Sequence, residues 1–261
     1  MRRFFVPRDS ISGDTAVITG GDVRHLRDVL RLGPGDEILI LDGYGNQYVS
    51  RIARISQDEV YCAIISASRR TSDPSVNVIL VQGLPKSDKM DIIVRAGTEL
   101  GVSHFHPVIT ERTVARPDVE AASKKVARLS RIAVEASKQS GRATIPAVHD
   151  ICNLSEAIRG KHIPPAAADC IWIVPWELEE NAGLRQGLRL LECTGDHTTP
   201  EVPGTVVCFI GPEGGLTRDE VLMIRDAGGI SVSLGPRILR TETAAISVIA
   251  AVLYEFGQLG G

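Results

Sequence analysis

The sequence lacks the patterns that mark metal or redox proteins. Its five cysteines are scattered and odd in number: Cys62, Cys152, Cys170, Cys193 and Cys208. None forms the C-x-x-C pair that is typical of zinc sites and redox dithiols. We therefore expect no bound metal and a reducing compartment.

Long apolar stretches are also missing. The chain contains no run of about 18 apolar residues, the length that crosses a bilayer. The basic start at residues 1–8 leads into no apolar segment with a small-residue cleavage site. We expect no membrane insertion and a cytoplasmic location. With 43% hydrophobic residues, the 261-residue chain is nevertheless able to bury a sizeable core.

Positive charge is scarce overall but unevenly distributed. The formal net charge of −3 argues against a nucleic-acid partner, because phosphate binding needs local positive charge. Residues 151–261 carry 8 basic and 14 acidic side chains, whereas residues 112–142 carry eight basic and three acidic ones. The local excess of positive charge fits either an RNA-binding surface or a solvated helix.

Short β-type runs fill most of the first 70 residues. Turn-forming Gly, Asp and Gln residues separate the runs, which cover residues 37–41, 47–55 and 59–67. This pattern predicts a small barrel. A polar stretch with a proline, residues 69–75, follows it, so we divide the chain into residues 1–72 and 73–261.

One short helix interrupts the β-rich part. Its apolar face holds Val23, Leu26 and Leu30. Beside that face, three arginines recur at helical spacing: Arg24, Arg27 and Arg31. We expect this arginine stripe to face solvent or a partner.

From Val76 onward, strand-like and helix-like segments alternate, which predicts an α/β domain with a mainly parallel sheet. The expected strands cover residues 76–82, 105–109, 171–174, 205–210 and 230–234. The expected helices cover residues 88–100, 119–140 and 244–256. A loop rich in Gly, Pro and Thr is expected over residues 194–204.

Two glycine-rich turns follow apolar strands in this second part. The first covers residues 211–215 and leads into Thr217 and Glu220, the capping box that starts a helix. The second covers residues 234–243 and leads into an apolar helix. Ligands bind beyond the carboxyl ends of parallel strands, and glycine lets the backbone approach them closely. Tight turn packing explains the same glycines without a ligand.

Neither turn has the spacing of a phosphate-binding loop. A dinucleotide site requires G-x-G-x-x-G and a P-loop requires G-x-x-x-x-G-K-[ST], and the chain contains neither motif. The pattern therefore favours a nucleoside-like ligand over one held by its phosphates, and it disfavours a dehydrogenase.

Together with other motifs, these turns resemble the RsmE family of ribosomal RNA uridine-N3 methyltransferases, members of the knotted SPOUT superfamily. The resemblance covers nearly the whole chain. Its motifs are MRRFFV at residues 1–6, HLRDVLRL at 25–32, LPKSDKMD at 84–91, TELGV at 98–102, TER at 110–112, QSGR at 139–142 and the two turns.

The resemblance implies a PUA-like barrel followed by an α/β SPOUT methyltransferase domain with a C-terminal trefoil knot. It implies an enzyme that methylates N3 of a uridine in small-subunit (16S) ribosomal RNA, either free or within the assembled 30S subunit. It also implies S-adenosylmethionine as cofactor and a homodimer.

By position, the resemblance assigns cofactor binding to the two turns and to the end of the 171–175 strand. The turn residues concerned are Gly211, Pro212, Glu213, Gly214, Leu234, Gly235, Ile238, Leu239, Arg240 and Thr241. Ser87 departs from the family pattern, because a glycine is common there. The segment from Trp172 to Trp176 and the loop after it also look unusual.

The chemistry of uracil N3 suggests the catalytic candidates. Its lone pair appears only after loss of a proton with a pKa of roughly 10. Arg240, with Arg237, is expected to stabilise negative charge on the uracil or to contact phosphates. Glu242 is the first candidate proton acceptor and Glu213 the second. Alternatively, Arg240 only pairs with one of these glutamates, and the glutamates only complement a helix dipole.

The remaining basic candidates are expected to contact RNA phosphates, which position RNA without reading its sequence. They are Arg2, Arg3, Arg24, Arg27, Arg31, Lys86, Lys89, Arg112 and Arg142. Two other functions use the same features. Another SPOUT activity, on a ribose 2′-O or a guanine, would need the same cofactor turns, whereas a non-enzymatic RNA-binding adaptor would need only the barrel and the basic helix.

Overall fold

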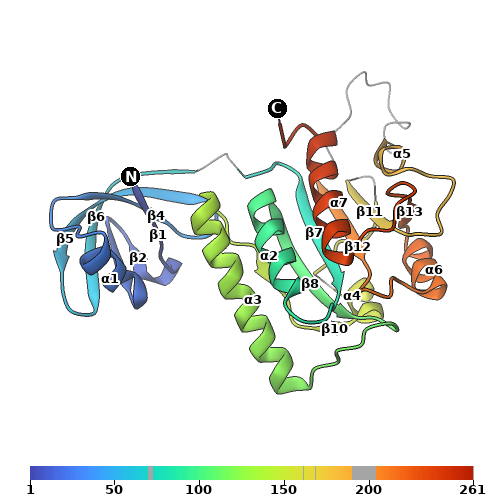
Figure 1. Cartoon of the computed structure of the whole chain (residues 1–261). Helices are drawn as coiled ribbons and strands as arrows, with labels where there is room; N and C mark the ends of the chain where they lie inside the picture. Colours follow the sequence, from blue (N-terminus) through green and yellow to red (C-terminus); the bar gives the residue numbers. More distant parts are fainter. Residues whose placement is uncertain (70–72, 161, 168, 190–203, 261) are drawn as a thin grey trace. The chain divides into compact units, whose positions relative to one another are not determined.

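A computed structural model describes the chain except residues 70–72, 161, 168, 190–203 and 261 (Figure 1). The expected loop at 194–204 therefore lies outside the described residues, apart from Gly204. The chain forms two compact units. The N-terminal unit consists of Met1–Asp73 with Ser137–Ile145, and the C-terminal unit consists of Pro74–Ala136 with Pro146–Gly261.

The second segment of the N-terminal unit differs from the sequence-based division, which assigned it to the later domain. Backbone and side-chain bonds hold it to the β-rich part. The Ile145 amide donates to the Gly43 carbonyl at 3.0 Å, and Lys138 pairs with Asp22 at 3.0 Å. Such long-range contacts cannot be read from local sequence patterns.

The N-terminal unit is built on a six-stranded sheet in the order β1-β4-β5-β6-β3-β2. The strands are β1 (Arg2–Phe5), β2 (Ile11–Ser12), β3 (Thr15–Thr19), β4 (Glu37–Leu41), β5 (Asn46–Ile55) and β6 (Glu59–Arg69). β1 pairs with β4 in parallel, and the other pairs are antiparallel. The predictions of β4, β5 and β6 are confirmed, while β1, β2 and β3 were not predicted.

Three helical turns complete this unit: η1 (Arg8–Ser10), α1 (Gly21–Arg24) and η2 (His25–Val29). The last two form the predicted short helix. Val23 and Leu26 are buried and Leu30 packs partly buried against the same core, so the predicted apolar face is confirmed. The arginine stripe is only partly confirmed: Arg24 is exposed, Arg27 is half-buried and pairs with Asp28, and Arg31 lies beyond the end of η2 with a φ of 56°.

The C-terminal unit contains a parallel sheet in the order β10-β8-β7-β12-β11-β13, with β9 beside β8. The strands are β7 (Asn77–Gly83), β8 (Val102–Ile109), β9 (Ala147–Val148), β10 (Cys152–Asn153), β11 (Cys170–Pro175), β12 (Thr205–Ile210) and β13 (Ile230–Val232). Every pair is parallel, which confirms the predicted α/β class.

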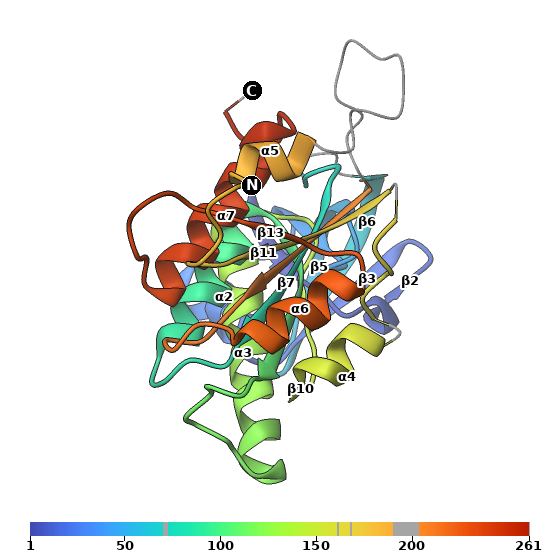
Figure 2. The ribbon, with the colours of Figure 1, turned by 90° about the vertical axis from the view of Figure 1, so that its right-hand side faces the viewer.

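Helices cover both faces of this sheet (Figure 2). They are α2 (Lys89–Leu100), α3 (Val119–Ser140), α4 (Leu154–Arg159), α5 (Leu184–Arg189), α6 (Arg218–Asp226) and α7 (Thr241–Glu255). Side chains of α2, α3, α5 and α7 pack in one core, and those of α4 and α6 pack in the other.

The strands supply both cores by alternation, because successive side chains of a strand point to opposite faces. On β7, Val78 and Leu80 belong to the α7 side, whereas Ile79 and Val81 belong to the α6 side. A sheet buried on both faces therefore reads as a continuous apolar run.

Helix α7 shows how much of the apolar C-terminus this chain buries by itself. Ile249, Val252 and Leu253 are fully buried in the core that α7 shares with α2, whereas Ile246 is half-buried. Among the described residues, no helix is both long enough and apolar enough to cross a membrane.

Four histidines of the C-terminal unit lie together beside β8. The rings of His106 and His149 stack at 3.9 Å between centroids, and His104 Nδ1 lies 3.1 Å from His149 Nε2. The ring of His162 is 4.9 Å from that of His149. His106 is 4% exposed, and its Nε2 has no hydrogen-bond partner. Two stacked imidazoles are packed here as neutral rings.

This cluster predicts a loss of stability in mild acid. Burial lowers the pKa of His106 to about 3 and that of His149 to about 4, with the neighbouring histidines adding to the effect and Asp150 opposing it at His149. The unfolded chain takes up these protons below roughly pH 6.5, and the folded protein does not. The free energy of unfolding should fall as pH drops from 6.5 towards 4, by up to about 1.4 kcal/mol per unit for each histidine.

Urea unfolding at pH 7 and pH 5 measures this slope. His106→Leu should reduce it, and substitution of the exposed His25 by Gln should leave it unchanged. Equal slopes in all three proteins would show that the cluster does not carry the effect.

Candidate active site

The first glycine-rich turn lies at the carboxyl ends of the adjacent strands β7 and β12. A Cβ on Gly83, the last residue of β7, would lie 2.5 Å from Pro212 Cδ. A Cβ on Gly211 would lie 2.6 Å from the carbonyl carbon of Gly215. The backbones touch at both positions, so no larger residue fits without moving the turn.

The predicted capping box fixes the other end of this turn. The Thr217 amide donates to Glu220 Oε2 at 2.9 Å, and the Glu220 amide donates to Thr217 Oγ1 at 3.3 Å. The second carboxylate oxygen of Glu220 accepts from the Glu111 amide at 2.8 Å. One buried glutamate thus ties the turn to the segment after β8.

The second turn is open. β13 ends at Val232 rather than at residue 234, and α7 begins at Thr241, with Arg240 as its N-cap residue. Gly235 has φ +98°, a conformation that L side chains rarely adopt, and no atom lies within 4 Å of its Cβ position. Ile238 is 93% exposed, and Leu239 is half-buried. Bare backbone and an apolar side chain therefore face open space.

A hydroxyl joins the two turns that the sequence singled out. Thr241 Oγ1 donates to the Gly211 carbonyl at 2.6 Å and accepts from Gln82 Nε2 at 2.9 Å. The start of α7 is therefore held against the end of β12, although about 30 residues separate them in the chain.

Lys89 sits between the two candidate glutamates. Its Nζ lies 2.9 Å from Glu213 Oε1 and 3.7 Å from Glu242 Oε2. Burial acts to raise the pKa of Glu213, but hydrogen bonds from Lys89 and the Lys86 amide outweigh it and hold that pKa below its ordinary value. Glu242 Oε2 is buried and has no hydrogen-bond partner. Glu213 therefore already accepts hydrogen bonds from Lys86 and Lys89, whereas Oε2 of Glu242 accepts none and could still take a proton.

Arg240 is exposed, and among the described residues it forms no ion pair. Among the described residues, Lys89 rather than Arg240 lies within ion-pair distance of Glu213 and Glu242. The hydrogen bond to Glu213 raises the pKa of Lys89, and the charge of Arg240 acts against that rise.

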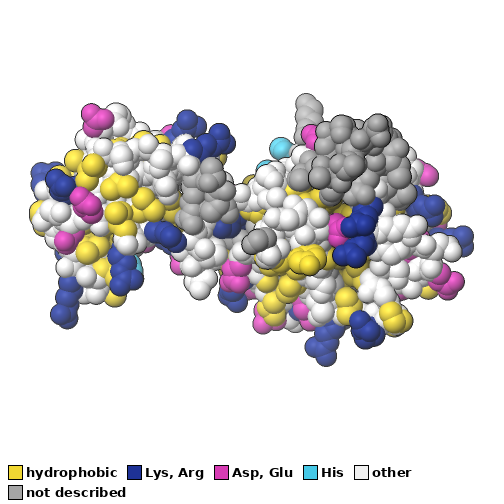
Figure 3. Space-filling model, turned by 90° about the horizontal axis from the view of Figure 1, so that it is seen from above, with side chains coloured by type: hydrophobic (Ala, Val, Ile, Leu, Met, Phe, Trp, Pro, Cys, Tyr) yellow, Lys and Arg dark blue, Asp and Glu magenta, His cyan; other side chains and the backbone are white. Residues whose placement is uncertain are grey.

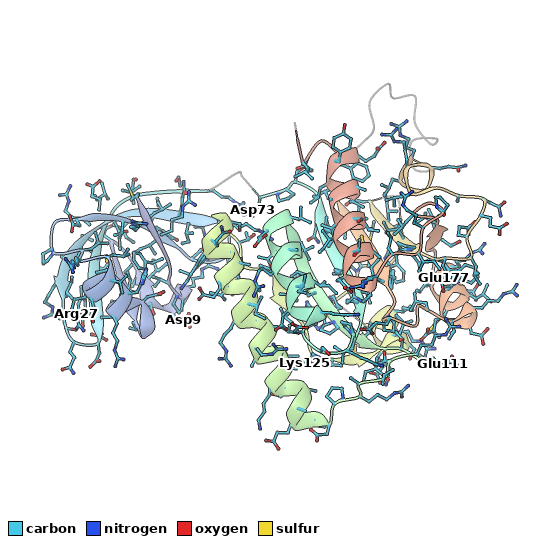
Figure 4. The ribbon with its side chains drawn as sticks, in the orientation of Figure 1. Asp9, Arg27, Asp73, Glu111, Lys125 and Glu177 are labelled. Atoms are coloured by element: carbon cyan, nitrogen blue, oxygen red, sulfur yellow. The ribbon has the colours of Figure 1, made fainter. Side chains whose placement is uncertain are left out.

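The end of β11 forms a third side of the site. The Trp176 amide donates to the Val232 carbonyl at 2.9 Å, and Glu177 lies 2.9 Å from the Cβ position of Gly215. Figure 4 labels Glu177 after β11 and Glu111 after β8. Ser87 has φ 57°, in the left-handed region that favours glycine, which accounts for the glycine that the resemblance leads one to expect there.

The basic residues expected to bind RNA differ in their exposure and in whether they already have a hydrogen-bond or ion-pair partner. Arg2, Arg3, Arg24, Arg31 and Lys86 are exposed. Figure 3 shows Lys and Arg side chains at several separate places on each unit.

Three of the other candidates already have partners. Arg27 pairs with the neighbouring Asp28 at 2.7 Å, and Lys89 with the glutamates. Arg112 Nη1 donates to the Gly214 carbonyl at 2.7 Å, so it braces the first turn.

Arg142 requires a correction. It is 7% exposed, and its Nε donates to Asp73 Oδ1 at 2.9 Å, while Nη2 donates to Thr144 Oγ1 at 3.0 Å. Its guanidinium is therefore a buried structural group of the N-terminal unit in this structure, not an open phosphate contact. Charge and position in the sequence do not reveal such burial.

Two contributors to the site were missed by sequence reasoning: Gln82, which reaches both turns, and Arg112 in its bracing role. The available signal was weak. Gln82 is a lone polar residue near the end of an otherwise apolar strand, and such a residue is often a satisfied core amide.

Comparison with known proteins identifies the family of this chain. A family described as an RNA methyltransferase domain matches residues 72–253, and an RNA methyltransferase PUA domain matches residues 18–65. The ribosomal RNA small subunit methyltransferase E of Bacillus subtilis is 31% identical, over 100% of this chain and 99% of its own length.

Two solved structures are similar over almost their entire length. The enzyme of the same name from Neisseria gonorrhoeae, bound to S-adenosyl methionine, is 31% identical with a TM-score of 0.78, covering 97% of each chain. A putative methyltransferase from Legionella pneumophila, in complex with the same cofactor, is 25% identical with a TM-score of 0.77, covering 97% of this chain and 96% of its own.

Fold and matches together define an RNA methyltransferase with an N-terminal PUA domain. More narrowly, the chain belongs to the ribosomal RNA small subunit methyltransferase E family, which confirms the resemblance drawn from its motifs.

The pair of buried Arg142 and half-buried Asp73 yields a prediction that separates a structural role from RNA contact. Arg142→Met leaves the Asp73 carboxylate without its partner and should lower the free energy of unfolding by up to about 3 kcal/mol. Urea unfolding measures the loss, and Asp73→Asn with Arg142→Met should restore part of it. A normal unfolding curve combined with weakened RNA binding would restore the phosphate-contact assignment.

Proposed function

We propose that this protein transfers a methyl group from S-adenosylmethionine to N3 of a uridine in small-subunit ribosomal RNA. The observation that carries the proposal is the junction of the two glycine turns at the carboxyl ends of β7 and β12 through Thr241 and Gly211. Relatives of this chain are named for methylation of that RNA, and the Neisseria relative binds S-adenosyl methionine.

The residues present fit a nucleoside-type cofactor. Arg112 already bonds the Gly214 carbonyl, and the Gly235 amide donates to Ser233 Oγ, so the Gly214 amide and the Gly235 carbonyl are the backbone groups that would meet an adenosine. The exposed Ile238 would offer an apolar contact for its base. Leu234, Leu239 and Pro212 would complete the apolar lining. When bound, the cofactor supplies a methyl group made electrophilic by its sulfonium.

The protein must remove the N3 proton of uracil and direct the nitrogen. Glu242 is the proposed acceptor, because its Oε2 has no hydrogen-bond partner whereas Glu213 is held by Lys86 and Lys89. A carboxylate is a weak base for a group with a pKa of roughly 10, so the developing uracil anion needs a positive partner. Loss of this proton would free the N3 lone pair, and the bound cofactor would supply the methyl group as its methyl carbon–sulfur bond breaks and its sulfonium becomes a neutral thioether.

Arg240 is the proposed positive partner. It is exposed, forms no ion pair among the described residues, and stands at the N-cap of α7, where the helix end adds partial positive charge. A fixed donor that faces a developing oxyanion stabilises it without reorganisation. Because N3 lies in the pairing edge of uracil, the target nucleotide must be unpaired or flipped out.

On the RNA side, we infer that the N-terminal unit, residues 1–72 in the division by sequence, binds phosphates through Arg2, Arg3, Arg24 and Arg31. Arg27, Lys86, Lys89 and Arg112 would add contacts once they exchange their present partners. The substrate is proposed to be small-subunit RNA in the cytoplasm, either free or within the 30S subunit. A non-enzymatic adaptor would leave the paired turns without a role.

We also infer a trefoil knot and a homodimer. After β13 at the sheet edge, the chain returns to the middle, where α7 packs against α2, β7 and β12, as a threaded C-terminus requires. The exposed Ile238 and half-buried Ile246 are available to a second chain. An electron-density map traces the knot, and sedimentation velocity measures the dimer.

The second turn predicts a selective defect. Gly235→Val forces a side chain into a left-handed conformation and onto the open face, so it should abolish S-adenosylmethionine binding in calorimetry. Gly257→Val is the matched control, since Gly257 also has positive φ (+66°) and open space but follows α7. Equal affinities of the two variants would contradict the cofactor assignment of this turn.

Arg240→Ala tests the chemistry. The folded variant should keep most of its cofactor affinity and lose single-turnover methylation by about a hundredfold, as expected for a lost charge-stabilising donor. Mass spectrometry of the RNA nucleosides identifies the product. A rate within about threefold of wild type would remove Arg240 from the mechanism. A 2′-O-methylated or guanine product would replace N3 methylation by another SPOUT activity.

A further inference from the structure

A single buried amide connects the end of β7 to both turns of the site. Gln82 is 0% exposed. Its Nε2 lies 2.9 Å from the Gly83 carbonyl, 3.2 Å from the Gly211 carbonyl and 2.9 Å from Thr241 Oγ1. No other buried polar side chain of the described site bonds to both turns.

The neighbours decide how this amide is oriented. Two of the three partners are carbonyl oxygens, which only accept, so the nitrogen must face them and the oxygen must face away. Oε1 is then left buried without a hydrogen-bond partner. An unpaired buried acceptor is costly, and the donor contacts of the same amide are what offset it.

We propose that Gln82 is a positioning residue that sets the separation of the two turns before the cofactor arrives. It acts through its neighbours: Thr241 Oγ1 accepts from Gln82 and donates to Gly211, so the three groups form a closed triangle. Close packing of Gly83 on Pro212 holds the same end of β7 in place. The inference rests on the proposed cofactor site, because its benefit is a preformed pocket.

The effect expected follows from preorganisation. Without the triangle, α7 and the first turn must be ordered when the cofactor binds, and that cost weakens affinity. Loss of one buried hydrogen-bonding group corresponds to about tenfold in affinity or more.

The variants Gln82→Met and Gln82→Glu test whether the hydrogen bonds of Gln82 contribute to cofactor affinity. Met keeps the length and loses the donor, and Glu keeps the shape and places a carboxylate against two carbonyl oxygens. Calorimetry should rank affinity for S-adenosylmethionine as wild type, then Met, then Glu. If Gln82 only fills space, Met should match wild type, because it keeps the volume and loses only the hydrogen bonds.

Hydrogen exchange in the protein without cofactor supplies a second readout. Amides of residues 211–215 and 241–244 should exchange about tenfold faster in Gln82→Met than in wild type. Thr98→Val is the matched control, because Thr98 is also fully buried and hydrogen-bonded, within α2 to Val94, but lies outside the turns. In Thr98→Val, the amide hydrogen exchange of the two turns and the affinity for S-adenosylmethionine should equal those of wild type.

The outcomes separate the two proposals. If wild type fails to bind S-adenosylmethionine, the proposed function fails, and hydrogen exchange still tests the triangle. If wild type binds, and Gln82→Met shows the same affinity and the same exchange as wild type, the role of Gln82 is overturned.

Discussion

The parallel pairing of β7 with β12 is the constraint on which the site depends. Residues 77–82 align with residues 205–210, so two segments that are far apart in the chain end side by side. Their carboxyl ends place Gly83 against Pro212 and Gln82 beside Gly211. In a parallel sheet all strands finish at the same edge, and this edge is where backbone groups remain available to a ligand.

The second turn reaches this edge from the other direction. It leaves β13 at the rim of the sheet and enters α7, whose buried face packs against α2 in the sheet core. Packing of α7 therefore decides where Thr241 lies, and Thr241 decides the spacing of the turns. Stability and cofactor geometry are joined here, because the helix that fills the core also carries the residues at its N-terminus that line the site.

The positions of the charged side chains in the site matter more than their number. One lysine serves two glutamates, which leaves Arg240 without an acidic partner among the described residues. An unpaired arginine next to a bare backbone suits an electron-rich substrate. The opposite holds at Arg142, where burial with Asp73 makes the cation part of the scaffold. Two arginines therefore have different roles because their surroundings differ: Arg240 is exposed in the site, and Arg142 is buried in the N-terminal unit.

Local patterns in the sequence were sufficient to predict much of this protein. Short apolar runs and the turn residues between them predicted β4 and β12 at the observed bounds, the basic helix α3 was also predicted at its observed bounds, and the motifs from Met1 to the second turn indicated the family. These features depend on neighbours in the chain, so periodicity and turn chemistry carry them. Only the tertiary structure decided that residues 137–145 join the N-terminal unit, that Arg142 is buried, and that Gln82 bonds both turns. Each of these depends on residues brought together from distant parts of the chain, and no local pattern records which distant backbone a side chain will meet.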